Sequence, residues 1–279
     1  MIIWIASYPK SGNTWVRSLL ASYLFSKDGS FSFDLLNKIG QFPSHDYLKF
    51  FLDKEKDRNK KVHEYWVAAQ DKINLNNKTN FLKTHNALCT IEKSPFTNKR
   101  NTIGVIYIVR DPRNVITSLS NHYEITIEEA FDFFTNEKKI IFESELGAGN
   151  FQFIGSWSAN YASWKNNKVF PKIIIKYEDL LSNTKETFIK ILNFLGEKES
   201  VQKNQEKIDK VIENCKFESL RNMEEKEGFY EAASSKRTKK KINFFHLGKK
   251  NDWKNLLDQK IEKKIRKIFS NEMKELGYN

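Results

Sequence analysis

Residues 2–15 read IIWIASYPKSGNTW, and this stretch decides the fold. Residues 2–6 are apolar without polar alternation, which is typical of a strand buried on both faces of a parallel sheet. Residues 7–13 then form a turn rich in Ser, Pro, Gly and Asn. From residue 14 to 25 the apolar side chains recur every three or four positions, which predicts a helix capped by Asn13 or Thr14. The chain therefore opens as strand, loop and helix.

The same order returns twice further along the chain. Residues 103–109 predict a second buried strand, ended by Asp111-Pro112 before a helix that begins near Arg113. Residues 172–176 (KIIIK) predict a third, followed by a helix over 184–195 that ends at Gly196. We also expect a short strand at 80–85, helices at about 127–144, 156–166, 203–213 and 258–275, and Lys-rich turns at 226–245. Strands alternating with helices predict an α/β fold with a central parallel sheet covered on both faces.

Length and composition indicate one folded domain. The chain has 279 residues, of which 39% are hydrophobic and 29% charged, so disorder as the global state is excluded. No repeat and no Pro/Gly linker divides it, and we expect one domain over 1–279 with a basic C-terminal lobe at about 226–279 that is not independent. Two cysteines 126 positions apart indicate neither a zinc site nor a disulfide framework. Without a signal-like or membrane-spanning segment, we expect a cytoplasmic protein.

Positive charge gathers at the C-terminal end. The formal net charge is +12, and residues 234–279 hold 14 Lys and Arg against 5 Asp and Glu. Such an excess predicts an anionic partner, which could be nucleic acid, an anionic membrane surface or a polyanionic small molecule. Charge alone does not choose among the three.

The loop at residues 8–15 (YPKSGNTW) has the chemistry of an anion site. A strand that passes into a helix here aims free backbone N–H groups and the positive helix end at the turn. Gly12 allows close approach of the backbone, Lys10 adds a full charge, and Ser11 and Thr14 add hydroxyl donors. The GxxxxGK[ST] pattern of P-loop nucleotide triphosphatases is not met, because the lysine precedes a single glycine.

The YPKSGNTW stretch resembles the 5′-phosphosulfate loop of the sulfotransferases that use 3′-phosphoadenosine 5′-phosphosulfate (PAPS), whose usual form is YPKSGTTW. Asn13 stands where that family has Thr. The resemblance implies a P-loop NTPase-like sulfotransferase fold and PAPS as co-substrate, leaving 3′-phosphoadenosine 5′-phosphate (PAP), with no metal. The loop residues expected to bind the nucleotide are Lys10, Ser11, Gly12, Asn13, Thr14 and Trp15.

Two further segments resemble the family's motifs for the 3′-phosphate and for the catalytic base. Residues 109–118 (VRDPRNVITS) are similar to the family's 3′-phosphate motif, which implies that Arg110 and Ser118 bind that phosphate, and Ser118 is counted among the catalytic residues as well. Residues 81–85 (FLKTH) resemble the segment that carries the catalytic base. His85 is then expected to deprotonate the acceptor, a role for which a pKa near neutrality suits it. Lys83 and Lys10 are expected to offset the charge that develops during transfer.

Later segments extend the resemblance over most of the chain. Residues 155–157 (GSW) and 176–180 (KYEDL) match family motifs, and Tyr177 is expected near the adenine. Trp15 and Phe217 are placed where the family stacks the adenine between aromatic faces. From the residues alone, Trp157, Trp164 and Tyr177 are better explained as core side chains than as contacts.

One segment departs from the family. Residues 246–253 read HLGKKNDW where the usual form is RKGxxGDW, so His246 and Leu247 replace two cations that hold the 3′-phosphate. Gly248 is retained. We expect the phosphate contact to be taken over by Lys249, by Lys250 or by the basic cluster within 236–241.

The acceptor is less well defined. Residues 28–79, 121–153 and 226–245 are expected to form its walls, and their aromatic content favours a flat or lipidic alcohol. The aromatic residues in question are Phe31, Phe33, Phe42, Tyr47, Phe131, Phe133, Phe134, Phe229 and Tyr230. The family's dimerisation segment KxxxTVxxxE is absent, so a dimer of that kind is not expected.

The sequence thus favours a PAPS-dependent sulfotransferase acting on a hydroxyl or amine of a small, apolar or aromatic acceptor by in-line displacement. Two alternatives remain open. A P-loop-like phosphotransferase would need a Walker lysine and an acidic magnesium ligand, which the sequence does not place. A basic protein that binds nucleic acid or a membrane surface would explain the charge of the tail but not the ordered motifs.

Overall fold

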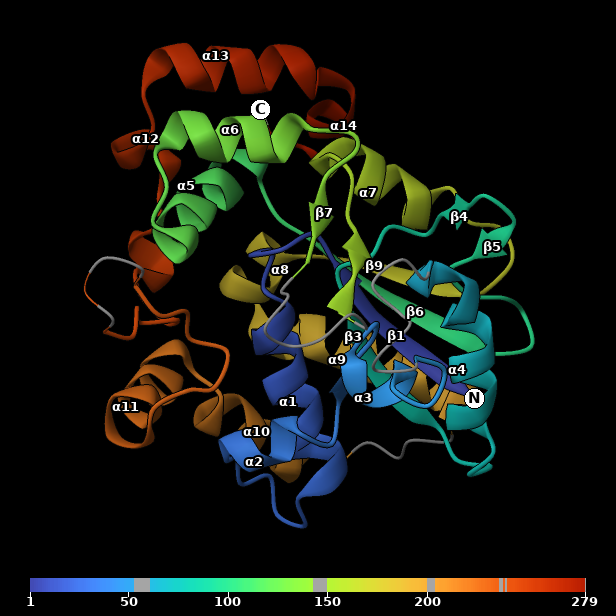
Figure 1. The fold of residues 1–279 in the computed structure, drawn as a ribbon. Helices are drawn as coiled ribbons and strands as arrows, with labels where there is room; N and C mark the ends of the chain where they lie inside the picture. The colour runs from blue at the N-terminus through green and yellow to red at the C-terminus, as the bar shows by residue number, and fades with distance from the viewer. Residues whose placement is uncertain (53–60, 143–149, 200–203, 236–237, 239, 279) are drawn as a thin grey trace.

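A five-stranded parallel sheet forms the centre of the computed structural model, which describes residues 1–52, 61–142, 150–199, 204–235, 238 and 240–278 (Figure 1). The strand order is β2-β3-β1-β6-β9, with β1 in the middle. The strands are β1 (Ile2–Ser7), β2 (Gly40–Gln41), β3 (Asn80–Thr84), β6 (Thr102–Val109) and β9 (Lys172–Lys176). The predicted α/β class with a central parallel sheet is confirmed.

The register brings the carboxyl ends of four strands to one edge of the sheet. Ala6 of β1 lies opposite Thr84 of β3 and Tyr107 of β6. Val109 of β6 lies opposite Lys176 of β9. Because all four strands run in parallel, the residues that follow them emerge together, which is where open α/β sheets bind their ligands.

Helices cover both faces of this sheet. One face packs on α1 (Asn13–Phe25), α9 (Thr184–Glu199) and α10 (Gln205–Asn214), where Ile3, Ile5 and Ile106 meet apolar side chains of these helices. The other face packs on α4 (Trp66–Asn74) and α7 (Trp157–Lys165). Successive side chains of a strand point to opposite faces, so a strand without polar residues supplies both cores.

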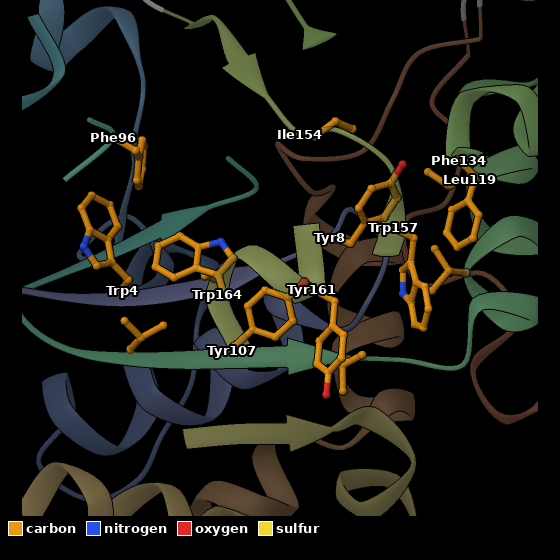
Figure 2. Packing of buried hydrophobic residues seen from close by; sticks show 14 of the residues in the cluster. Trp4, Tyr8, Phe96, Tyr107, Leu119, Phe134, Ile154, Trp157, Tyr161 and Trp164 are labelled. Atoms are coloured by element: carbon orange, nitrogen blue, oxygen red, sulfur yellow. The ribbon is translucent and has the colours of Figure 1, made fainter. Parts of the chain in front are cut away.

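Large aromatic rings fill the second of these cores (Figure 2). Trp4 of β1 and Tyr107 of β6 lie near Trp164 of α7, and all three are almost fully buried. The polar atoms of these three rings have partners: the indole of Trp4 donates to Thr102 Oγ1 at 2.8 Å, the indole of Trp164 to the Asn86 carbonyl at 3.0 Å, and the Tyr107 hydroxyl to Asn160 Oδ1 at 2.9 Å. Burial with satisfied hydrogen bonds makes these rings structural.

The remaining elements surround the sheet. Two short antiparallel pairs are β4 (Thr90–Ile91) with β5 (Ser94–Pro95) and β7 (Ile140–Ile141) with β8 (Gln152–Phe153). The other helices are α2 (Phe33–Leu36), α3 (His45–Leu48), η2 (Val62–Tyr65), α5 (Pro112–Tyr123), α6 (Ile127–Thr135), α8 (Tyr177–Ser182), α11 (Phe217–Glu227), η5 (Gly248–Lys250), α12 (Trp253–Leu256), α13 (Gln259–Ile268) and α14 (Ser270–Leu276). Within the described ranges, no helix is both long and apolar enough to cross a membrane.

The C-terminal helices pack beside α5 and α6, at the top of Figure 1. Arg113 of α5 is held in this interface, with its guanidinium 4.0 Å above the Trp253 ring and bonded to Asp111 at 2.6 Å. Phe269, between α13 and α14, meets the ring of Phe134 of α6 edge-on at 5.2 Å. The basic end of the chain is thus joined to the helix that follows β6.

Three predicted helices differ from the structure. The helix expected over 127–144 ends at Thr135, because Asn136 is extended and residues 140–141 pair with β8. The helix that was to end at Gly196 continues to Glu199, since a glycine in a helix interior costs only about 1 kcal/mol. The helix expected over 258–275 breaks at Phe269, and Ile268, which was assigned to the apolar face, is 52% exposed.

Candidate active site

A cleft of about 1120 Å³ lies at the carboxyl edge of the sheet. Its floor is made by the residues that directly follow β1, β3, β6 and β9, which include Lys10, His85, Arg110 and Tyr177. The segments 230–235 and 244–248 form a further wall. The order and register of the sheet therefore bring together residues that lie up to 167 positions apart in the sequence.

The loop after β1 is shaped to surround an anion. Lys10 and Gly12 both adopt the left-handed region, with φ of 64° and 99°, and such turns point successive N–H groups inward. A Cβ on Gly12 would lie 2.5 Å from Cδ2 of Tyr177, so only glycine fits. The helix α1 begins directly after Gly12, which has no side chain to cap it. Ser11 is buried, and its hydroxyl has no hydrogen-bond partner among the described residues.

Lys10 reaches into the cleft from this loop. Its ammonium lies 4.0 Å from the centre of the Phe244 ring. Burial lowers the pKa of Lys10 to about 7, with Glu231 opposing that shift and Arg110 adding to it. A lysine near its titration point gains charge when an anion binds, because the anion favours the protonated form.

Arg110 and Tyr177 join the loop to β6 and β9. The Arg110 guanidinium donates from Nη1 to the Lys10 carbonyl at 3.1 Å and lies 4.2 Å from the centre of the Tyr177 ring. Its Nε is buried and has no partner among the described residues. Ser118, two turns into α5, lines the same cleft. The predicted 3′-phosphate pair therefore lies in one cavity with the loop.

The two aromatic residues expected around an adenine also line this cleft. Trp15 donates from its indole to the Cys215 carbonyl at 2.9 Å and meets Tyr177 edge-on at 5.7 Å. Phe217 lies so close to Gly248 that a Cβ there would be 2.6 Å from its ring. Flat apolar surfaces are thus present on the nucleotide side.

Two predicted loop ligands already have partners. Asn13 donates from Nδ2 to the Ile5 carbonyl at 2.9 Å and to Ser7 Oγ at 3.2 Å, so its side chain ties α1 to β1. Thr14 donates from its hydroxyl to Glu231 Oε2 at 2.9 Å. The backbone N–H of Asn13 lies at the start of the helix, whereas its side chain is used in hydrogen bonds within the protein.

His85 follows β3 and faces the cleft as a neutral base. Its Nδ1 lies 2.8 Å from the Ser7 carbonyl, and because a carbonyl only accepts, the ring hydrogen belongs on Nδ1. Nε2 therefore carries the lone pair. Burial, together with the charge of Lys83, lowers the pKa of His85 to about 3. The expected pKa near neutrality is therefore wrong for His85 in this environment.

Several polar residues of the cleft were not singled out from the sequence, among them His122, Gln152 and Glu231. His122 follows Ser118 by one helical turn of α5, a spacing that could have indicated it. Burial lowers its pKa to about 3, and Lys10 and Lys83 add to the shift. Gln152 accepts from the His85 backbone N–H at 3.2 Å. No motif singled out Gln152 or Glu231, although both lie in segments that were expected to form the acceptor walls.

The aromatic wall expected around the acceptor is mostly core. Of the nine residues assigned to it, only Tyr230 lines the cleft, while the others belong to the two hydrophobic clusters or pack against them. The cleft lining instead combines polar residues such as Gln41 and Gln152 with apolar Ile39 and Phe142. Sequence composition could not distinguish aromatic residues in the core from those that line the cleft, because both places use the same residue types.

The segment with the replaced cations borders the cleft. His246, Leu247 and Gly248 line it, whereas Lys250 is exposed. The side chain of Lys249 lies outside the described residues, as do Lys236, Arg237 and Lys239 of the basic cluster. The other two cluster lysines, Lys240 and Lys241, are exposed.

Comparisons with known proteins identify the family and the fold. The family model of the "Sulfotransferase domain" matches residues 2–277. A flavonol 4′-sulfotransferase of Flaveria chlorifolia is 27% identical over 292 residues, covering 99% of this chain and 80% of the relative. Among solved structures, retinol dehydratase in a complex with retinol and PAP has a TM-score of 0.62 at 18% identity, covering 98% and 81% of the two chains. Mouse sulfotransferase 7A1 complexed with PAP has a TM-score of 0.57 at 19% identity, covering 98% and 84%.

Proposed function

The chain belongs to the sulfotransferase family, and on that premise we propose that it moves a sulfuryl group from PAPS to a hydroxyl or amine of a small molecule. The observation that carries the proposal is the joining of the anion loop, Arg110 and His85 in one cleft. Relatives named for flavonol and retinol chemistry support a small-molecule acceptor.

The residues present fit the donor. Its anionic groups call for several N–H and O–H donors and for positive charge, and the cleft supplies the loop amides, the unpartnered Ser11 hydroxyl, Lys10 and the unpartnered Nε of Arg110. Trp15 and Phe217 would hold the adenine. Arg110 and Ser118 would hold the 3′-phosphate, with Gly248 offering its backbone, and Lys249 or Lys250 would take over from the cations replaced by His246 and Leu247.

His85 would act as the general base. Its Nε2 takes the proton of the acceptor hydroxyl or amine while that oxygen or nitrogen forms a bond to sulfur, and the bond from sulfur to the phosphate oxygen breaks to leave PAP. The hydrogen bond from Nδ1 to the Ser7 carbonyl orients the ring and stabilises the imidazolium that results. Lys10 and Lys83 would offset the charge on the departing oxygen and the sulfuryl group.

The side chains of the cleft support a choice of acceptor class. Gln152, which accepts from the His85 backbone N–H, and Gln41 offer hydrogen bonds, while Ile39 and Phe142 offer apolar contacts elsewhere along the cleft. We propose an amphipathic hydroxyl compound, with one apolar or aromatic part, as the acceptor. A panel of phenols, sterols, fatty alcohols and sugars with labelled PAPS tests this directly.

Thermal unfolding with three ligands tests the donor. At a concentration about 100-fold above its dissociation constant, PAP should stabilise the fold by about 2.7 kcal/mol, which raises the melting temperature by roughly 5 °C for a chain of this length. ATP with magnesium and duplex DNA at two salt concentrations serve as the controls. An equal shift with ATP and magnesium would favour a phosphotransferase, and a salt-sensitive shift with DNA alone would favour a nucleic-acid-binding protein.

A further inference from the structure

Glu231 is a buried carboxylate inside the cleft that the sulfotransferase motifs do not include. Its Oε1 lies 2.6 Å from Arg17 Nη1 and 3.2 Å from Lys83 Nζ, and its Oε2 accepts from the Thr14 hydroxyl at 2.9 Å. The side chain of Glu231 is 14% exposed, and those of Arg17 and Lys83 are 2% and 9% exposed. One carboxylate therefore bridges α1, β3 and the segment that follows α11.

The contact with Arg17 alone would be an ordinary buried ion pair. The other two contacts go to groups that the proposed reaction needs: Thr14 opens the helix at the anion loop, and Lys83 lies two positions before His85. A hydroxyl donates one hydrogen, so Thr14 serves either Glu231 or an anion in the loop, but not both. The ammonium of Lys83 also donates to Glu231.

Glu231 is charged in this environment. Although burial by itself would raise its pKa, Lys83 and Arg17 hold the pKa of Glu231 well below its ordinary value. A second anion brought to Thr14 and Lys83 meets the full negative charge of this carboxylate at short range, where the effective dielectric constant is low. The segment cannot simply swing away, because Phe229, two positions earlier, is packed among Phe33 and Phe245.

We propose that Glu231 is an internal anion that occupies Thr14 and Lys83 when the cleft is empty and competes for them with the 5′ anionic groups of the nucleotide. The inference rests on the proposed function, because it takes the donor to bind at the loop after β1. The Glu231 carboxylate would weaken the binding of both PAPS and PAP. It would also speed the release of PAP, since the carboxylate binds Thr14 and Lys83 again as the product leaves. Glu231 is thus a positioning residue rather than a catalytic one.

Isothermal titration of Glu231→Gln tests the competition. We expect PAP to bind about tenfold more tightly than to the wild type, because the substitution removes one negative charge beside the site. Adenosine 3′-phosphate, which lacks the 5′ group, should bind with unchanged affinity. Glu227→Gln is the matched control, since it makes the same change of charge on the exposed end of α11 and should leave both affinities unchanged.

Turnover provides the second measurement. Where PAP release limits the rate, Glu231→Gln should lower kcat and the KM for PAPS together, whereas a structural role would raise the KM or lower kcat alone. Should Glu231→Gln fail to fold because Arg17 loses its partner, the double variant Arg17→Gln/Glu231→Gln removes the ion pair as a unit and still frees Thr14 and Lys83. Unchanged or weaker PAP binding in the variant that folds overturns the inference. Absence of PAP binding to the wild type would instead refute the proposed function.

Discussion

PAP binding should depend on pH through Lys10, because burial lowers the pKa of Lys10 from 10.5 to about 7. Above pH 7 the free protein holds Lys10 mostly neutral, while the bound anion favours its charged form. Binding must then take up a proton from solution, and affinity falls as pH rises. If the bound lysine regains an ordinary pKa, the dissociation constant should rise about 50-fold between pH 7 and pH 9, which is about 2.3 kcal/mol.

Isothermal titration at pH 7, 8 and 9, in buffers with different heats of ionisation, measures both the slope and the protons taken up. The range avoids the second ionisation of the phosphate near pH 6. Lys10→Met should bind more weakly at pH 7 and should lose most of the slope, whereas Lys250→Met, which changes an exposed lysine of the C-terminal lobe, should keep it. A flat wild-type profile, or the same slope in Lys10→Met, would refute the assignment of the shifted pKa to Lys10.

Three further substitutions test the cleft. His85→Ala should leave PAP affinity nearly intact and cut sulfuryl transfer by about 10²–10⁴-fold, the range for losing a positioned base, and transfer at the wild-type rate would place the base elsewhere. Arg110→Ala should weaken PAP by about 1.5–3 kcal/mol in a titration, because it removes a charged donor, and unchanged affinity would mean that the phosphate lies elsewhere. Gly12→Ala should lower both the melting temperature and the affinity for PAP, because the added Cβ would lie 2.5 Å from the Tyr177 ring on a backbone in the left-handed region. A second substitution, Tyr177→Ala, in the same chain should remove the clash and leave only the cost of the backbone conformation. An unaltered melting temperature in the single variant would argue against this packing.

The sequence predicted the local elements on which the site is built. Residues 2–6, 103–109 and 172–176 have no polar alternation, and buried parallel strands require such a pattern, so all three were located within one or two residues. Gly12 could likewise be assigned from sequence, because an anion loop needs a residue that tolerates the left-handed region. These features depend on neighbours along the chain.

The surroundings of each side chain depended on the tertiary structure. The pKa of His85 was expected near neutrality, but burial and the ammonium of Lys83 lower it to about 3. Most of the phenylalanines expected at the acceptor lie in the core, because composition shows how much apolar surface a segment has and not which side faces a cavity.

Glu231 is the clearest example of a feature that depends on the tertiary structure rather than on neighbours along the chain. Its partners Thr14, Arg17 and Lys83 precede it by 217, 214 and 148 positions. No periodicity or motif links residues at such separations, since only the packing of α1, β3 and the segment after α11 brings them together. The sequence alone predicts an anion site after the first strand. The charges that face this loop follow from the tertiary structure, because charge interactions depend on distance in space and on burial.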